Sequence, residues 1–317
     1  MNPRHAIALL VALAAMAGCQ RDHAPPSAPT PTSPAATPSQ QPDPWAIAPI
    51  KREPLARPLL WSIEKDGHTS YALGTIHMGV DPESRLPDVV WQKLDHAPTF
   101  AMETDLSDPS LTKDISSRHD GRTLHEDLGD AYWHKLETAL GATTAERLDH
   151  MPPTIPATLL STRNMPSTEP MDGVLLARAQ RGHEHIVYLE PATKQLALLV
   201  KWMDVKALEQ MLDDLDEDDQ NQKALLAAYI AGDDAKMLAL SDEERGEWKK
   251  AGRSDAEYDQ MMKEMLYDRN ASWIPAIEEL HHAGGGFIAV GAMHLIGKGS
   301  VLDLLGQRGY KVTRLTP

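Results

Sequence analysis

Gly74-Thr75-Ile76-His77 follows the apolar run Tyr71-Ala72-Leu73, and Gly291-Ala292-Met293-His294 follows Phe287-Ile288-Ala289-Val290. In both places a strand-like run is followed by glycine, two residues and a histidine, and then by a loop, a helical pattern and another strand. The glycine lets a strand turn sharply or lets a ligand approach the backbone. These two units predict an α/β fold, with a mixed β-sheet core flanked by many helices.

The surrounding patterns supply the rest of the predicted sheet. Residues 59–64 and 69–73 alternate apolar and polar side chains, and Asp66-Gly67 between them is a strong hairpin signal. Residues 99–103 are typical of a buried strand, 186–189 of a short strand and 310–315 of the last strand. The chain between the two units is predicted to be mostly helical, with a long helix over 255–282.

The two histidines are candidate metal ligands. Each lies just past the carboxyl end of a predicted strand, where ligands bind in open α/β sheets. Glu103 also ends a strand, and two histidines with a carboxylate form a common set of divalent-metal ligands. The alternative is that each histidine is a hydrogen-bonded structural residue. Because the context occurs twice, we favour a shared site for His77, His294 and Glu103.

Arg269 and Asn270 interrupt an otherwise apolar and charged helical pattern with two strong hydrogen-bond donors. An arginine on a buried helix face near a metal can hold a carboxylate or a developing oxyanion. A surface salt bridge is the alternative that the pattern leaves open. Other catalytic motifs are absent from the sequence: there is no HExxH and no GxSxG, and the loop after Gly291 lacks the spacing of a phosphate loop.

The N-terminal residues predict export and lipidation. The apolar run 6–17 is too short to span a bilayer, and it ends at Ala17-Gly18-Cys19, which resembles a bacterial lipobox. We predict a lipoprotein signal peptide over 1–18 and a lipidated Cys19; an ordinary signal peptide with an incidental cysteine is the alternative. Gln20 after the cysteine favours the outer membrane, facing the periplasm, as the location in a bacterial envelope.

Residues 19–44 are rich in Pro, Ala, Ser and Thr and predict a disordered, extended tether. Residues 45–317 then form the predicted folded domain. The formal net charge of −15 argues against nucleic acid as a partner. The expected contact with a membrane is through the N-terminal lipid only.

Together, these stretches resemble the TraB/GumN family, which includes the TIKI proteins. The resemblance runs from about 59 to 315. It rests on the two GxxH units, on Ala101-Met102-Glu103-Thr104-Asp105, on the helix that begins Met171-Asp172, on Tyr188-Leu189-Glu190, and on Asp268-Arg269-Asn270-Ala271-Ser272-Trp273. Gly173 departs from the family pattern, which often has a larger residue after the aspartate.

The resemblance implies a TIKI-like fold, similar to the erythromycin esterase and ChaN group. It implies a metal-dependent peptidase in which His77, His294 and Glu103 bind manganese or cobalt, with zinc also possible. Glu103 and Arg269 would be catalytic, with Arg269 supporting the transition state. Further pocket residues would be Gly74, Gly291, Asp172, Glu190 and Asn270.

Two further functions stay open at the level of sequence. One is a non-catalytic binding lipoprotein that captures a small ligand, haem or a polysaccharide fragment; the ChaN resemblance makes a histidine-ligated haem conceivable. The other is an envelope assembly factor that acts through protein contacts. The preferred hypothesis is a periplasm-facing hydrolase acting on a peptide or small molecule, in which a metal lowers the pKa of bound water.

Overall fold

The computed structural model describes residues 53–105, 107, 108, 118, 120–182 and 184–317. The predicted signal peptide, the lipidation site Cys19 and the tether over 19–44 lie outside the described residues, as does the start of the predicted domain at 45. No helix in the described part is both long enough and apolar enough to cross a bilayer.

The core is a mixed, six-stranded sheet with the strand order β4-β3-β5-β2-β1-β6. Strands β2, β5, β3 and β4 run parallel, and β1 is antiparallel to both of its neighbours. The strands are β1 (Leu60–Lys65), β2 (His68–Thr75), β3 (Thr99–Met102), β4 (His185–Tyr188), β5 (Phe287–Gly291) and β6 (Lys311–Arg314). The predicted α/β class with a mixed sheet is therefore confirmed.

The hairpin β1–β2 turns where the sequence predicts it. Lys65 pairs with His68 across a two-residue loop in which Asp66 and Gly67 both have positive φ angles, of 49° and 81°. That backbone is the type I′ turn that Asp-Gly favours.

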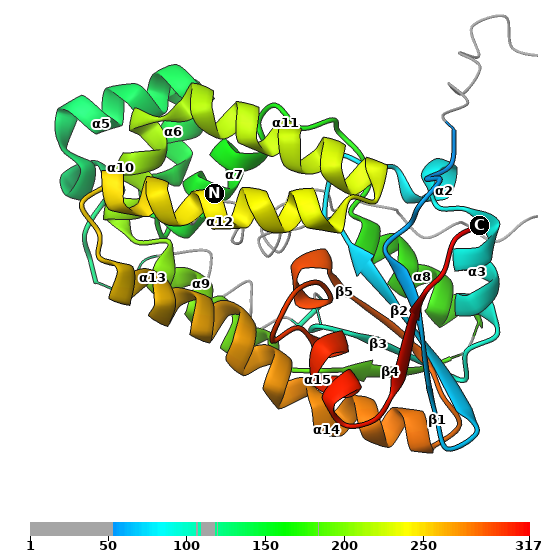
Figure 1. Ribbon diagram of the computed structural model, residues 1–317. Helices are drawn as coiled ribbons and strands as arrows, with labels where there is room; N and C mark the ends of the chain where they lie inside the picture. Colours follow the sequence, from blue (N-terminus) through cyan, green and yellow to red (C-terminus); the bar gives the residue numbers. More distant parts are fainter. Residues whose placement is uncertain (1–52, 106, 109–117, 119, 183) are drawn as a thin grey trace, which may run out of the picture.

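Many helices surround the sheet (Figure 1). Near its strands lie α2 (Pro82–Arg85), α3 (Asp88–Asp95), α8 (Met171–Gly182), α9 (Ala192–Trp202), α14 (Asp268–His282) and α15 (Val301–Gln307). Farther from the strands, α13 (Asp255–Met262) precedes α14 in the chain. A second group of helices forms a lobe to one side, comprising α5 (Leu124–Leu140), α6 (Ala142–Leu148), α7 (Thr154–Thr162), α10 (Val205–Asp213), α11 (Leu215–Ala231) and α12 (Asp234–Lys250).

The two predicted GxxH units are both present; the first crosses β5 to reach β3, and the second crosses β2 and β1 to reach the edge strand β6. The first runs from β2 through α2 and α3 to β3; the second runs from β5 through the 3-10 helix η3 (Ala292–His294) and α15 to β6. Side chains of neighbouring β2 residues point to opposite faces of the sheet: Ser70 contacts His281 of α14, and Tyr71 contacts Lys93 of α3. The helix α15 of the second unit packs against α14, so the two units cover opposite faces. Adjacent strands whose connections leave toward opposite faces of the sheet create a crevice at their carboxyl ends.

The predicted long helix over 255–282 is interrupted in a way that the sequence did not reveal. A π-helical turn, η2 (Lys263–Tyr267), joins α13 to α14. Such turns insert one residue into the helical repeat and are frequent at functional sites. Arg269 lies two residues after the end of this turn.

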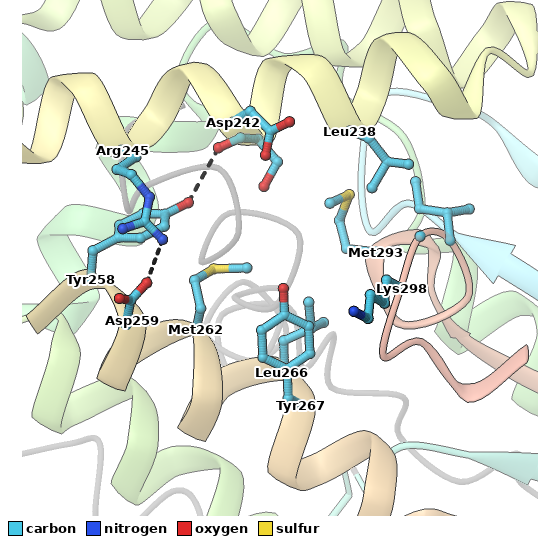
Figure 2. A pocket seen from close by; sticks show the side chains of 13 residues that line it. Leu238, Asp242, Arg245, Tyr258, Asp259, Met262, Leu266, Tyr267, Met293 and Lys298 are labelled. Carbon is cyan, nitrogen blue, oxygen red and sulfur yellow. Dashed lines mark hydrogen bonds and ion pairs between the residues drawn. The ribbon is translucent and has the colours of Figure 1, made fainter. Parts of the chain in front are cut away.

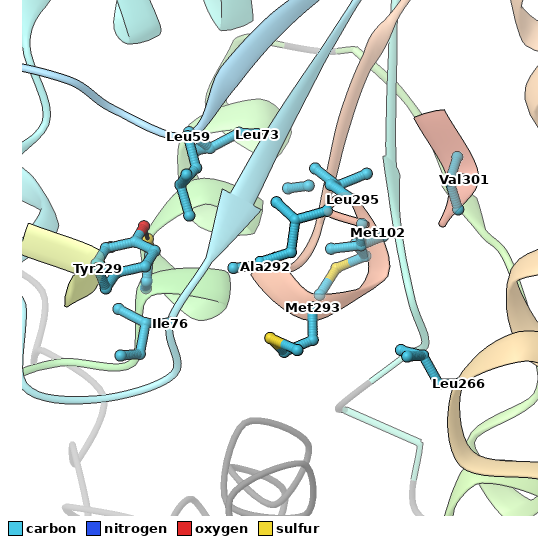
Figure 3. Packing of buried hydrophobic residues seen from close by; sticks show 14 of the residues in the cluster. Leu59, Leu73, Ile76, Met102, Tyr229, Leu266, Ala292, Met293, Leu295 and Val301 are labelled. Carbon is cyan, nitrogen blue, oxygen red and sulfur yellow. Dashed lines mark hydrogen bonds between the residues drawn. The ribbon is translucent and has the colours of Figure 1, made fainter. Parts of the chain in front are cut away.

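Close packing beneath the crevice explains Gly74. A Cβ atom on Gly74 would lie 3.0 Å from the Cα of Ala292 and 3.1 Å from the Cβ of Leu59. Figure 3 shows Ala292 and Leu59 beside this part of β2, within the buried apolar cluster. The glycine is thus required by the close approach of the two GxxH units.

Candidate functional site

Four parallel strands each deliver one polar residue to the same edge of the sheet. His77 follows β2, His294 follows β5, Glu103 follows β3 and Glu190 follows β4. All four are buried, with relative exposures of 9% for His77, 6% for Glu103, 4% for Glu190 and 1% for His294. Unpaired polar groups are costly at such burial, so their hydrogen bonds decide the chemistry of the site.

Asp172, at the start of α8, orients His77. Its Oδ2 lies 2.6 Å from His77 Nδ1, and its Oδ1 accepts a hydrogen bond of 2.8 Å from the Thr75 hydroxyl. An imidazole that donates from Nδ1 presents the lone pair of Nε2. His77 Nε2 is buried and has no hydrogen-bond partner among the described residues. It is therefore poised either to take a proton or to bind a metal.

The electrostatics of His77 follow from the same contact. Burial acts to lower the pKa of His77, but the charge and hydrogen bond of Asp172, with a contribution from Glu103, raise it above its ordinary value. His77 is thus a stronger base than a free histidine.

Arg269 lies at the centre of the site and is fully buried. Its Nη2 donates to Glu103 Oε2 at 2.7 Å, and its Nε donates to Glu190 Oε1 at 2.7 Å. Its Nη1 donates to the carbonyl of Met265 in the π-helical turn and lies 3.1 Å from His294 Nε2. All three nitrogens of the guanidinium therefore face protein acceptors. The surface salt bridge that the sequence left open is excluded.

The hydrogen-bond donors around Glu103 keep its side chain ionised. Its Oε1 accepts from the backbone N–H of Gly291 at 2.8 Å, and its Oε2 accepts from Gln195 Nε2 at 3.1 Å as well as from Arg269. Burial acts to raise the pKa of Glu103, but His294, Arg269, His77 and the Gly291 N–H together lower it to about 2. His294 is itself neutral near pH 7, so the cation that stabilises Glu103 at that pH is Arg269.

His294 differs from His77 in every contact. Its Nδ1 lies 2.6 Å from Asn270 Oδ1, and its Nε2 faces the guanidinium of Arg269. Burial, with the repulsion of nearby cations, lowers the pKa of His294 to about 3 despite the attraction of Glu103. Its ring packs at 4.5 Å from that of Trp273. His294 therefore serves as a neutral acceptor for Arg269.

The charges of the site do not balance within its buried part. Glu103, Glu190 and Asp172 bring three acidic side chains, whereas Arg269 is the fully buried cation among them. With His294 neutral, Arg269 alone does not balance these carboxylates, and His77 offsets one more negative charge only when it is protonated. Lys194, half exposed at 3.3 Å from Glu190 Oε2, offsets part of this excess. A divalent cation would offset the remainder.

The donor atoms fit such a cation in part. His77 Nε2 is unpartnered, and Glu103 Oε1 accepts one hydrogen bond and so keeps a lone pair. His294 Nε2 lies 3.9 Å from Glu103 Oε1, but it can become a ligand only by leaving Arg269. Within the described ranges no three His, Cys, Asp or Glu side chains form a ready metal-binding group. His77 and Glu103 are the residues that would hold a metal.

The remaining sequence-predicted residues take supporting positions. Asp172, Glu190 and Asn270 each contact a central residue directly, Gly291 contributes its backbone N–H, and Gly74 serves the packing described above. Sequence reasoning missed Gln195 and Thr75 as contacts. Gln195 lies early in α9, shortly after Glu190 in the chain, and this proximity is the signal that could have located it.

A cavity of about 440 Å³ lies beside the site, between α12, α13 and the loop after η3 (Figure 2). Its lining includes Met293 and Leu266 but none of His77, Glu103, Arg269 or His294. Met293 precedes His294 in the chain. The cavity is therefore adjacent to the candidate site and separate from it.

Comparison with known proteins identifies relatives of the chain. The family model described as the TraB/PrgY/gumN family matches residues 59–314. A protein of Shigella flexneri named "Uncharacterized protein YbaP" is 24% identical over 248 residues, which covers 74% of this chain and 87% of that protein. No solved structure matches the chain.

Proposed function

The chain belongs to the TraB/PrgY/gumN family, and from this premise we propose that it is a metal-dependent hydrolase of the bacterial envelope. The single observation that supports the proposal best is His77. Its Nε2 is buried and unpartnered, its other nitrogen is oriented by Asp172, and the neighbouring groups carry an excess of negative charge. A histidine held by a carboxylate in this way is the usual arrangement of a metal ligand.

Under this proposal the residues have distinct tasks. His77 and Glu103 hold the metal, which would be manganese, cobalt or zinc and which would supply a Lewis acid that lowers the pKa of water. Asp172 fixes the tautomer of His77. Arg269 is a positioning residue, because its nitrogens are all engaged with Glu103, Glu190, His294 and Met265. It holds Glu103 ionised and in place for the reaction.

The proposal is tested first by metal content. Purified protein is equilibrated with Mn²⁺, Co²⁺ or Zn²⁺, separated from free metal and measured by elemental analysis. We expect about one metal per wild-type chain and a loss in His77→Ala and Glu103→Gln. His134→Ala, on a highly exposed side chain, is the matched control. Equal metal in wild type and His77→Ala would sink the proposed metal site.

The second test is activity. Metal-loaded protein is incubated with quenched-fluorescence peptides and with ester substrates, and the products are identified by mass spectrometry. Turnover that is lost in His77→Ala but kept in His134→Ala supports a hydrolase. Metal binding without any turnover would instead support the binding-protein alternative, and a visible-absorption titration with haem would then test that ligand.

The proposed location rests on the sequence alone. We propose that Cys19 is lipidated and that the domain faces the periplasm from the outer membrane. Labelling of cells with a clickable fatty acid should mark the wild-type protein but not Cys19→Ser. Equal labelling of the two forms would contradict lipidation at this residue.

A further inference from the structure

The cavity beside the site has an apolar floor. Leu238 of α12, Met262 of α13, Leu266 of the π-helical turn, and Met293 and Ile296 near η3 line it. Figure 2 shows Met262, Leu266 and Met293 directed toward this space from different elements. A volume of about 440 Å³ lies in the range of small-molecule pockets. Methionine side chains adapt to aliphatic groups of varied shape.

Most of the polar groups at the cavity are already engaged. Arg245 forms ion pairs with Asp259 and Asp255, and the hydroxyl of Tyr258 donates to the carbonyl of Ser241 at 3.2 Å. These groups satisfy one another, so they leave little for a ligand to bind.

Two opposite charges at the cavity differ in this respect. Asp242, on α12, and Lys298, on the loop after η3, both line the cavity, and neither has an ion-pair or hydrogen-bond partner among the residues that the structure describes. Figure 2 shows them on different walls, with Asp242 on the upper helix and Lys298 on the loop at the right. An acid and an amine that face one cavity from separate elements match a ligand carrying both charges.

We propose that this cavity binds a small zwitterion with an aliphatic side chain, the chemistry of a free aliphatic amino acid or of a short aliphatic peptide with both ends free. The ammonium group of the ligand pairs with Asp242, its carboxylate pairs with Lys298, and its side chain lies on the methionine and leucine floor. The site is distinct from the His77–Arg269 cluster, so this binding does not depend on hydrolysis.

The test uses isothermal titration of the whole folded protein with leucine and with leucyl-leucine, which distinguish the two sources of this chemistry. N-acetyl-leucine, leucinamide and N-acetyl-leucinamide lack one or both charges. We expect saturable binding of leucine or leucyl-leucine, at least tenfold weaker binding of each singly blocked compound, and no measurable binding of the doubly blocked one. Equal binding of free and blocked compounds overturns the proposal, as does the absence of binding by both free ligands.

Variants localise the binding. Lys298→Met and Asp242→Asn, both at exposed positions, should each weaken ligand binding about tenfold or more. Met262→Trp should fill the apolar floor of the cavity and so weaken binding as well. Lys223→Met, at an exposed lysine outside the cavity, is the matched control. His77→Ala should bind as wild type does, which separates this proposal from the proposed hydrolase. Unchanged binding in Lys298→Met and Asp242→Asn places the ligand elsewhere and overturns the assignment.

Discussion

At the scale of single residues, the two GxxH histidines are not equivalent. His77 has a carboxylate behind it and an unpartnered nitrogen in front, whereas His294 has the amide of Asn270 behind it and the guanidinium of Arg269 in front. The same motif therefore produces a base with a raised pKa and a neutral acceptor with a pKa of about 3. What differs between them is the partner of each ring, which comes from another part of the chain.

The contact between Asp172 and His77 predicts a pH dependence. In metal-free protein, Asp172→Asn removes the charge that raises the pKa of His77, so this pKa should fall below its wild-type value. A group whose pKa is raised on folding contributes stability in full below its unfolded pKa, near 6.5. That contribution disappears as the pH rises through the folded pKa. The stability lost in Asp172→Asn should therefore be greatest in mild acid and shrink with rising pH.

Histidine NMR titration and urea unfolding across this pH range measure both effects. Thr75→Val is the control, because it removes one hydrogen bond to Asp172 and leaves the charge. A loss in Asp172→Asn that is the same at every pH would contradict the role of its charge. In the metal-loaded protein, the same variant should weaken metal affinity roughly 10–100-fold.

Arg269→Met should be among the most destabilising substitutions of an ionic residue in the domain. It leaves Glu103 and Glu190 buried without their cation, and loss of one partner of a buried ion pair costs about 3–5 kcal/mol. Arg245→Met is the matched control, because that ion pair is exposed and contributes at most about 1 kcal/mol. Urea unfolding measures both. A loss in Arg269→Met no larger than that in Arg245→Met would mean that water enters the network.

At the scale of elements, the approach of β2 to η3 predicts that Gly74→Ala is costly. The added methyl would press on the Cα of Ala292 at 3.0 Å, and backbone cannot move aside as a flexible side chain can. Overpacking of this kind costs about 1–3 kcal/mol. Gly306→Ala in α15 is the control: it meets open space and should stabilise the helix by about 0.5–1 kcal/mol. Thermal unfolding measures the pair, and similar melting temperatures would refute the packing argument.

Local signals predicted the elements well. Asp66-Gly67 fixed a turn because few residue pairs adopt its two positive φ angles, and the apolar runs before Gly74 and Gly291 gave the strands β2 and β5. The π-helical turn before Arg269 escaped prediction because a one-residue insertion barely disturbs an apolar face. The resemblance to the family placed Asp172 in the pocket, but the contact of Asp172 with His77 and that of Gln195 with Glu103 escaped prediction for another reason. Both residues come to the site through the packing of α8 and α9 on the sheet, which no local pattern encodes.

At the scale of the whole molecule, the sheet itself creates the site. The connections after β2 and β5 run in opposite directions across the sheet, to β3 and β6, so the carboxyl ends of β2 and β5 are left free for His77 and His294. Glu103 and Glu190 arrive from the next two parallel strands, and α14 brings Arg269 across them. The charged residues of the site come from several strands and helices. Any charge that is not compensated therefore affects the free energy of unfolding of the whole domain.

This coupling predicts that a bound metal stabilises the whole domain. A ligand that binds only the folded state raises the free energy of unfolding by about 2.7 kcal/mol at a concentration of 100 times its Kd. For a domain of this size that corresponds to a rise in Tm of roughly 5–10 °C. Scanning calorimetry with and without Mn²⁺ should show this rise in the wild type and in His134→Ala. His77→Ala should show none, because it lacks the unpartnered nitrogen; an equal rise in His77→Ala would mean that the metal acts at another place on this acidic chain.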